Sequence, residues 1–331
     1  MDSLTQIALG ACVTAACAPR EQMRKAILIG AALGTLPDLD VAIDFGDAVR
    51  NFTMHRGFSH SLFVLIPLSL LIWFFLKKFW QPIRESPLPW LTAISLTLIT
   101  HVLLDAHTAY GTQLWWPLDP PPTAWATLFI IDPVYTLPLL MAALAAFFRP
   151  SSKGAKRWLL TGLLLSTVYI AWSWTAREIV LSNAQKSLSQ IGIKNASVFI
   201  TPTPFNTLLW RVVAIDEDQY LEGFDSVAIN DGFIKFSSHS RGSSHLESNQ
   251  TIPAVKRLRW FADGFVRAEI HHNELIITDL RMGFEPDYVF RHVVATYGNP
   301  HWIPITPVRL NTNLDMSRLS EVWQRIWKAP E

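Results

Sequence analysis

The sequence is poor in charged residues, which make up 17% of its 331 positions, against about 25% in an ordinary globular domain. Half of the residues are hydrophobic, and the mean hydropathy is positive, at +0.22. This composition argues against a wholly soluble protein and favours one that lies partly in a membrane.

An excess of either charge is also lacking, because the formal net charge is only +1. Nucleic-acid binding requires a clustered basic surface, so we expect no nucleic-acid partner. The two cysteines, Cys12 and Cys17, are five residues apart and would face different sides of a helix, which predicts free thiols. The N-terminal stretch lacks a basic segment and carries Gln6, so we expect no cleavable signal peptide.

Long apolar segments predict a membrane helix bundle over residues 1–180. A short helix pair comes first, from Ser3, the expected N-cap, to about Ala18, and then from about Ala26 to Leu36. Gly30 and Gly34 are four apart, which predicts close approach of another helix. Four membrane spans are expected to follow: Ser59 to about Trp80, Pro89–His107, Pro133–Phe148 and Trp158 to about Ala176.

Residues 181–331 have a different pattern, with shorter hydrophobic runs bounded by Gly, Pro and Asp. They predict a soluble α+β domain with an antiparallel sheet and a helix over Pro253–Phe261. The expected strands are Val198–Thr201, Leu208–Ile215, Phe265–His271, Leu275–Asp279 and Tyr288–Ala295.

The distribution of Lys and Arg predicts the orientation in the membrane. Basic loops follow the first helix, the first span and the third span, and they alternate with loops that hold two basic residues or none. The N-terminus, the loop at residues 55–60, the loop after Asp105 and the second domain are therefore expected on the extracytoplasmic side. The loop Tyr110–Trp125, rich in proline and tryptophan, is expected at the membrane interface.

Seven polar residues are expected at this one membrane face, although none of them belongs to the Lys and Arg pattern that predicts the orientation. They are Asp2, Asp38, Asp40, His55, His60, His101 and Asp105. His101 and Asp105 are four apart, so both lie on one face of a helix and are suited to ligate one cation. Histidine at the mouth of a membrane helix is costly unless it is solvated, paired or metal-bound, so simple His–Asp pairing is the alternative.

The residues around this predicted metal site suggest further roles. His55 lies in a loop and His60 in the first turn of a helix, so they can approach a cation from different directions. One of Asp38 and Asp40 would ligate, while the other orients a histidine or acts as general base. Arg56 is suited to an anionic substrate or transition state. Three further residues are weaker candidates for the site: Asp2, His107 and Asp132.

Several motifs resemble those of the inner-membrane, membrane-bound metal-dependent hydrolases, some of which are LexA-regulated. The matching segments are 2–6 (DSLTQ), 34–40 (GTLPDLD), 55–61 (HRGFSHS), 101–105 (HVLLD), 110–113 (YGTQ) and 131–133 (IDP), with 203–211 and 279–283 in the second domain. The His-x-x-x-Asp helix is also similar to that of the zinc-dependent bacterial phospholipase C.

The resemblance implies a bacterial inner-membrane enzyme that uses a divalent metal, Zn²⁺ or Mn²⁺, to activate water. A site at the lipid boundary favours a lipid or lipid-linked phosphoester or ester as substrate. A metal-stabilised binding or regulatory protein without turnover is the alternative. A transporter is less favoured, because the cytoplasmic halves of the predicted spans are almost purely apolar.

Overall fold

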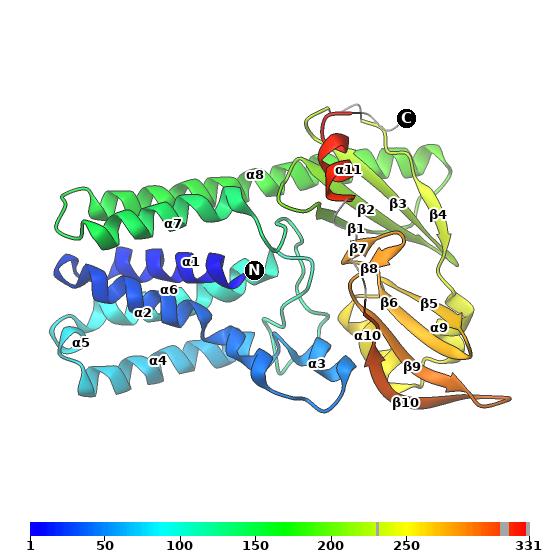
Figure 1. Ribbon diagram of the computed structural model, residues 1–331, viewed down its shortest axis with the longest axis horizontal. Helices are drawn as coiled ribbons and strands as arrows, with labels where there is room; N and C mark the ends of the chain where they lie inside the picture. Colours follow the sequence, from blue (N-terminus) through cyan, green and yellow to red (C-terminus); the bar gives the residue numbers. More distant parts are fainter. Residues whose placement is uncertain (230–231, 312–317, 329–331) are drawn as a thin grey trace.

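The chain forms a helical bundle followed by a domain of antiparallel sheets, and the two lie end to end along the long axis (Figure 1). The computed structural model describes residues 1–229, 232–311 and 318–328. The N-terminus lies where the bundle meets the sheets (Figure 1).

The bundle contains long helices and several short helical elements. The long helices are α1 (Ser3–Cys17), α2 (Met23–Thr35), α4 (Leu62–Phe79), α6 (Pro87–Ala106), α7 (Pro133–Phe148) and α8 (Ala155–Gln190). The short elements are α3 (Ala48–Met54), α5 (Gln81–Glu85) and the 3₁₀ turns η1 (Arg20–Gln22), η2 (Pro37–Ala42) and η3 (Phe58–His60).

Among the described residues, three helices are long and apolar enough to cross a membrane: α4, α6 and α8. The predicted span Pro133–Phe148 forms a helix with those bounds, but at 16 residues it is shorter than the roughly 20 that a full span needs. The predicted count of four spans is therefore not confirmed.

Helices α1 and α2 pack closely through glycines, as Gly30 and Gly34 predicted. A Cβ atom at Gly30 would lie 2.2 Å from the carbonyl oxygen of Gly10, and one at Gly34 would lie 2.4 Å from that of Gln6. Both separations are far below van der Waals contact. Only glycine therefore allows the two backbones to approach this closely.

Two predicted helix caps are wrong by one or two residues. Asp2, rather than Ser3, caps α1, because its side chain accepts a hydrogen bond from the Thr5 amide. Ser61, rather than Ser59, caps α4 through the Phe63 amide. The 3₁₀ turn η3 occupies residues 58–60 and so places the start of α4 two residues later than expected.

Helix α8 is 36 residues long and does not end near Ala176 as predicted. At 1.5 Å per residue it extends about 54 Å, well beyond the roughly 30 Å hydrocarbon core of a bilayer. Beyond the bundle, its residues Ala176, Val180 and Ala184 are buried against Trp210 and Val212 of the sheet domain. The predicted boundary at residues 180–181 thus falls inside a continuous helix.

The described part of the second domain contains two four-stranded antiparallel sheets and a two-stranded one, where the sequence predicted a single sheet. Within the described ranges, one sheet has the strand order β1-β2-β3-β4, the other has the order β10-β9-β6-β5, and β7 pairs with β8. The strands are β1 (Ser197–Pro202), β2 (Leu209–Asp216), β3 (Gln219–Ser226), β4 (Ser237–Ser240), β5 (Val266–His271), β6 (Glu274–Asp279), β7 (Gly283–Phe284), β8 (Asp287–Tyr288), β9 (Arg291–Tyr297) and β10 (Trp302–Arg309). The helices of this domain are α9 (Ser243–Ser248), α10 (Pro253–Phe261) and α11 (Arg318–Arg325).

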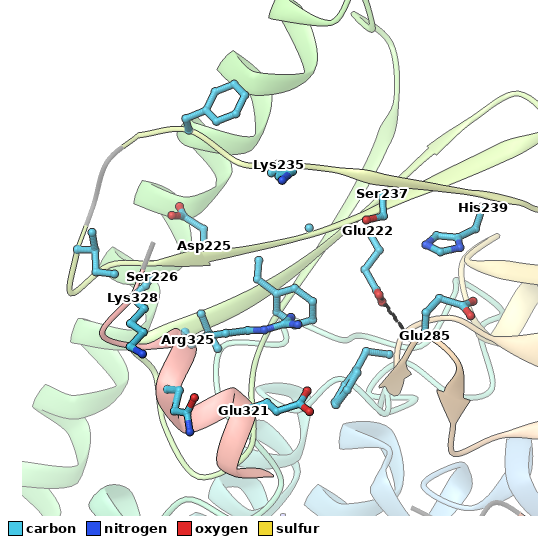
Figure 2. Close-up of a pocket in the computed structure, with 17 residues that line it drawn as sticks. Glu222, Asp225, Ser226, Lys235, Ser237, His239, Glu285, Glu321, Arg325 and Lys328 are labelled. Atoms are coloured by element: carbon cyan, nitrogen blue, oxygen red, sulfur yellow. Dashed lines mark hydrogen bonds between the residues drawn. The ribbon is translucent and has the colours of Figure 1, made fainter. Parts of the chain in front are cut away.

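A buried ion pair within the β1–β4 sheet also contacts the segment that follows β6. Arg211 of β2 donates to the Glu222 carboxylate on β3 at 2.6 Å and to the carbonyl oxygen of Leu280 at 2.7 Å, just beyond β6. Glu222 also accepts a hydrogen bond from the backbone amide of Glu285, the contact dashed in Figure 2. Because Arg211 is buried, its charge requires these acceptors.

Candidate metal centre

Four of the predicted ligands meet at the end of the bundle that faces the sheet domain. Asp38, His60, His101 and Asp105 each offer a ligand atom, and these four atoms lie within 4.8 Å of one another. Asp38 lies on η2, His60 ends η3, and His101 and Asp105 lie in the last turns of α6. Three separate segments therefore build one cluster.

Local sequence explains how each segment reaches this point. Pro37 cannot continue the hydrogen bonding of α2, so the chain turns into η2 immediately after the helix. His60 lies two residues before α4 and is placed by a 3₁₀ turn. His101 and Asp105 are separated by one helical turn, as their spacing predicted.

The donor atoms face one another closely. Nε2 of His60 lies 3.3 Å from Nε2 of His101 and 3.2 Å from Oδ2 of Asp105. Oδ1 of Asp38 lies 3.3 Å from the His60 nitrogen and 3.6 Å from the His101 nitrogen. His60, His101 and Asp105 are buried, whereas the Asp38 side chain is 21% exposed and marks the more open side.

The hydrogen bonds of the two histidines fix which ring nitrogen carries the proton. Nδ1 of His101 lies 2.7 Å from the carbonyl oxygen of Gly34, which can only accept, so Nδ1 is the donor. Nδ1 of His60 lies 2.9 Å from the Ser59 hydroxyl, which itself donates to Asp40 and is left to accept. When both rings are neutral, their Nε2 lone pairs therefore point into the cluster, an arrangement typical of metal-ligating histidines.

A divalent cation fits this donor set. Two imidazole nitrogens and two carboxylate oxygens form a borderline set suited to Zn²⁺ or Mn²⁺. The Oδ2 atom of Asp105 is buried, and no described residue gives it a well-formed hydrogen bond. A buried carboxylate oxygen of this kind is costly alone, and a cation between the four donors would satisfy it.

The other oxygen of Asp105 is held in place by neighbouring side chains. Oδ1 accepts a hydrogen bond from Nε2 of Gln6 at 3.0 Å and lies 3.3 Å from Nη2 of Arg56. The Met1 amino group also contacts this oxygen. The arginine side chain is buried, donates to Thr108 and lies over the Tyr110 ring, so it faces Asp105 from inside the protein.

Asp40 lies beside the cluster and binds three donors. It accepts hydrogen bonds from Nδ1 of His55 at 2.7 Å, from the Ser59 hydroxyl at 2.5 Å and from the Arg56 amide at 2.9 Å. Burial alone would raise the pKa of Asp40, but the hydrogen bonds from His55 and Ser59 hold it below its usual value. Asp40 thus stays ionised and positions Ser59, which in turn orients His60.

Comparison with known proteins places this helical bundle in a family. Residues 1–180, more than half of the chain, match the YdjM inner membrane protein family. The chain belongs to this family. It is also 25% identical to the Bacillus subtilis (strain 168) protein YfhP over 281 residues, which cover 82% of each protein.

A second relative is the inner membrane protein YbcI of Escherichia coli (strain K12), which is 29% identical over 114 residues. This match covers 34% of the chain and 64% of YbcI. No solved structure matches the chain. The family and this relative's name agree with the inner-membrane resemblance of the sequence and support a location in the bacterial inner membrane.

The structure places the remaining predicted site residues outside the group of four. His55 lies on the far side of Asp40, Asp2 caps α1, and Asp132 caps α7 (Pro133–Phe148) while accepting a hydrogen bond from Tyr169. His107 donates to the carbonyl oxygen of Leu103 and packs between two tryptophans, Trp125 and Trp174.

Gln6 and Ser59 are among the residues that contribute to the site without having been predicted to do so. Gln6 binds Asp105, and Ser59 links Asp40 to His60. Both lie within the segments 2–6 and 55–61 that carry the family resemblance, and this resemblance is the only sequence feature that could have indicated a role for them at the site. The sequence pattern alone indicates Ser59 only as a helix cap.

Proposed function

We propose that this protein is a membrane-embedded, metal-dependent hydrolase that acts on a lipid or lipid-linked phosphoester or ester at the extracytoplasmic face. The observation that carries the proposal is the convergence of two Nε2 lone pairs and two carboxylates at one end of the bundle. A bound divalent cation would supply Lewis acidity, polarising the scissile bond and lowering the pKa of a water molecule.

In this proposal the residues of the chain have distinct roles. Asp38, His60, His101 and Asp105 hold the cation. Arg56 aligns Asp105, because its buried guanidinium lies 3.3 Å from that carboxylate; we therefore give it a positioning role in place of direct contact with substrate. Asp40 positions His60 through Ser59.

The surroundings of the site support a substrate that comes from the lipid boundary. An open hollow of about 500 Å³ is lined by Asp40 and His55. Leu39 and Val41 are exposed and alternate with Asp38 and Asp40 along η2, and the exposed Ile43 follows η2 directly. His55, whose side chain is 23% exposed, offers a hydrogen-bonding ring to a polar group in this hollow. Exposed apolar side chains beside a polar site are suited to an amphipathic substrate.

The test is metal content measured by mass spectrometry on the detergent-purified protein, followed by an assay against lipid phosphoesters and esters. We compare the parent protein with the double variant His60→Ala/Asp105→Ala. A control, His271→Ala/Asp263→Asn, changes the same residue types at exposed positions of the sheet domain. Stoichiometric metal and hydrolysis, both lost only in the His60/Asp105 variant, would support the proposal. Unchanged metal and activity in that variant would refute it.

The burial of the cluster favours one alternative, a metal that only stabilises the bundle. Three of the four ligands are fully buried and connect η3 with α6. A protein of this kind would unfold when a chelator removes the metal, and it would hydrolyse none of the lipid esters tested. Retained fold together with metal-dependent turnover would exclude it.

A further inference from the structure

We propose that the hollow between α3, α10 and β10 binds the phosphate-bearing headgroup of an anionic membrane lipid. This hollow has a volume of about 750 Å³ and is separate from the one beside His55. Its walls come from the bundle end and from the sheet domain, including Arg50, Lys256, Arg257 and Trp260. The inference does not depend on hydrolysis at the metal centre.

Three basic side chains line the hollow, and they are only partly neutralised. Arg50 lies 3.4 Å from Asp47, whereas Lys256 and Arg257 form no ion pair with any described residue. Asp119 is the second acidic residue of the lining. The lining therefore keeps a net positive charge and is complementary to an anion.

Arg257 is held in a position suited to phosphate. Its Nε donates to the Thr53 hydroxyl, and its guanidinium lies 5.3 Å from the centre of the Trp260 ring. These contacts fix the plane of the guanidinium, and a fixed guanidinium binds phosphate oxygens with little loss of entropy. Burial and the nearby charge of Arg50 both lower the pKa of Arg257, so two like charges approach here without a full counter-charge.

The position of the hollow indicates a lipid in place of a soluble anion. Next to it, exposed apolar residues surround the start of α4: Met54, Phe58, Phe63, Trp115, Trp116 and Leu118. Phe58 pairs with Trp116 and Phe63 with Trp115, with ring centres 6.3 Å apart in both cases. Exposed tryptophans at the end of a membrane helix are typical of the headgroup layer.

This apolar surface continues into the hollow. Met54 belongs to both, and Leu118 directly precedes the lining residue Asp119. A lipid whose acyl chains lie beside α4 would therefore place its headgroup against the basic residues. A free phosphate ion would use the charges but not the adjoining apolar surface.

The experiment measures binding of phosphatidylglycerol to the full-length, detergent-purified protein by native mass spectrometry. Phosphatidylcholine and inorganic phosphate serve as competitors. The variant Arg50→Gln/Lys256→Gln removes two exposed charges of the hollow and spares the half-buried Arg257. The control Arg259→Gln/Lys194→Gln removes two charges elsewhere on the same domain, one of them on the same helix.

We expect the Arg50/Lys256 variant to bind phosphatidylglycerol about thirtyfold more weakly, and the control to bind like the parent protein. Arg257→Lys keeps the positive charge but loses the planar guanidinium group. It should therefore weaken binding less than Arg257→Gln, which removes both. Equal affinity in parent and Arg50/Lys256 variant would overturn the proposal. Full displacement of the lipid by inorganic phosphate would also overturn it, since it would show a site for a free anion.

Discussion

The ring of His101 on α6 donates a hydrogen bond to the backbone carbonyl oxygen of Gly34 on α2, 2.7 Å away. Gly34 is also one of the glycines through which α2 packs on α1. The same residue therefore sets the spacing of two helices and the direction of a candidate metal ligand. Changes in helix packing are expected to alter metal binding without touching a ligand.

Gly34→Ala tests this coupling. The added Cβ would lie 2.4 Å from the carbonyl oxygen of Gln6, so α1 and α2 must separate. We expect a loss of stability of about 1–3 kcal/mol, typical of overpacking, together with reduced metal content. Thermal unfolding and metal analysis in detergent measure the two effects. Leu28→Ala, at an exposed position of α2, is the control; normal metal content in Gly34→Ala would contradict the coupling.

Asp40→Asn distinguishes a positioning role from that of a general base. If Asp40 orients His60 through Ser59, the variant should bind the cation about 10–100-fold more weakly. If Asp40 is the base, metal affinity should stay normal while turnover falls. Metal titration followed by the lipid-ester assay separates the two results, with Asp44→Asn, at an exposed position of the neighbouring loop, as control.

Removing Arg211 should destabilise the sheet domain. Arg211→Leu leaves Glu222 buried without its cation, and we expect a loss of about 3–5 kcal/mol in the free energy of unfolding. The double variant Arg211→Leu/Glu222→Leu should recover much of this loss, since no unpaired charge remains. Urea unfolding measures both, and Lys194→Leu at an exposed site is the control. A double variant as unstable as the single one would show that packing, and not charge, is responsible.

The buried side chain of His292, on β9, should make the sheet domain less stable in acid. Its ring is fully buried, and neither ring nitrogen has a hydrogen-bond partner among the described residues. Burial, with the nearby charge of Arg309, lowers the pKa of His292 from 6.5 to about 4. Between these values the unfolded chain binds a proton that the folded chain does not, so stability falls as the pH falls through this window.

Between pH 7 and pH 5 this difference amounts to about 2 kcal/mol. Urea unfolding at the two pH values should show the loss in the parent protein, and His292→Leu should remove most of it. His271→Leu, at an exposed position, should behave like the parent. An unchanged pH dependence in His292→Leu would assign the acid sensitivity to other groups.

The parts of the site that sequence predicts are those set by local geometry. His101 and Asp105 share a helix face because of their spacing, and charge alternation predicted that the other ligands lie at the same end of the bundle. The close contact of α1 and α2 also follows from two glycines four apart. These features depend on periodicity along one segment.

The parts that could not be predicted depend on contacts between distant segments. The choice of Asp38 over Asp40 as a ligand is decided by where η3 places Ser59 and His60, which no pattern in residues 37–42 shows. His107 turns away because Trp125 and Trp174, from other parts of the chain, enclose its ring. The division of the second domain into separate sheets likewise depends on where the run of antiparallel pairs is interrupted, because β4 pairs with β3 and β5 with β6 but, in the described part of the chain, β4 does not pair with β5.

Helix α8 is unbroken from Ala155 to Gln190 and passes from the bundle into the sheet domain. It therefore fixes both the distance of the sheet domain from the bundle and its rotation about the helix axis. Each residue inserted into an α-helix lengthens it by about 1.5 Å and rotates the rest of the chain by about 100°. A single insertion after Ala176 would therefore turn β1 and β2 away from the site end of the bundle, whereas the same insertion in a flexible linker would change nothing. The length of this helix thus sets where the sheet domain lies relative to the bundle, even though α8 contributes no residue to the group of four candidate ligands.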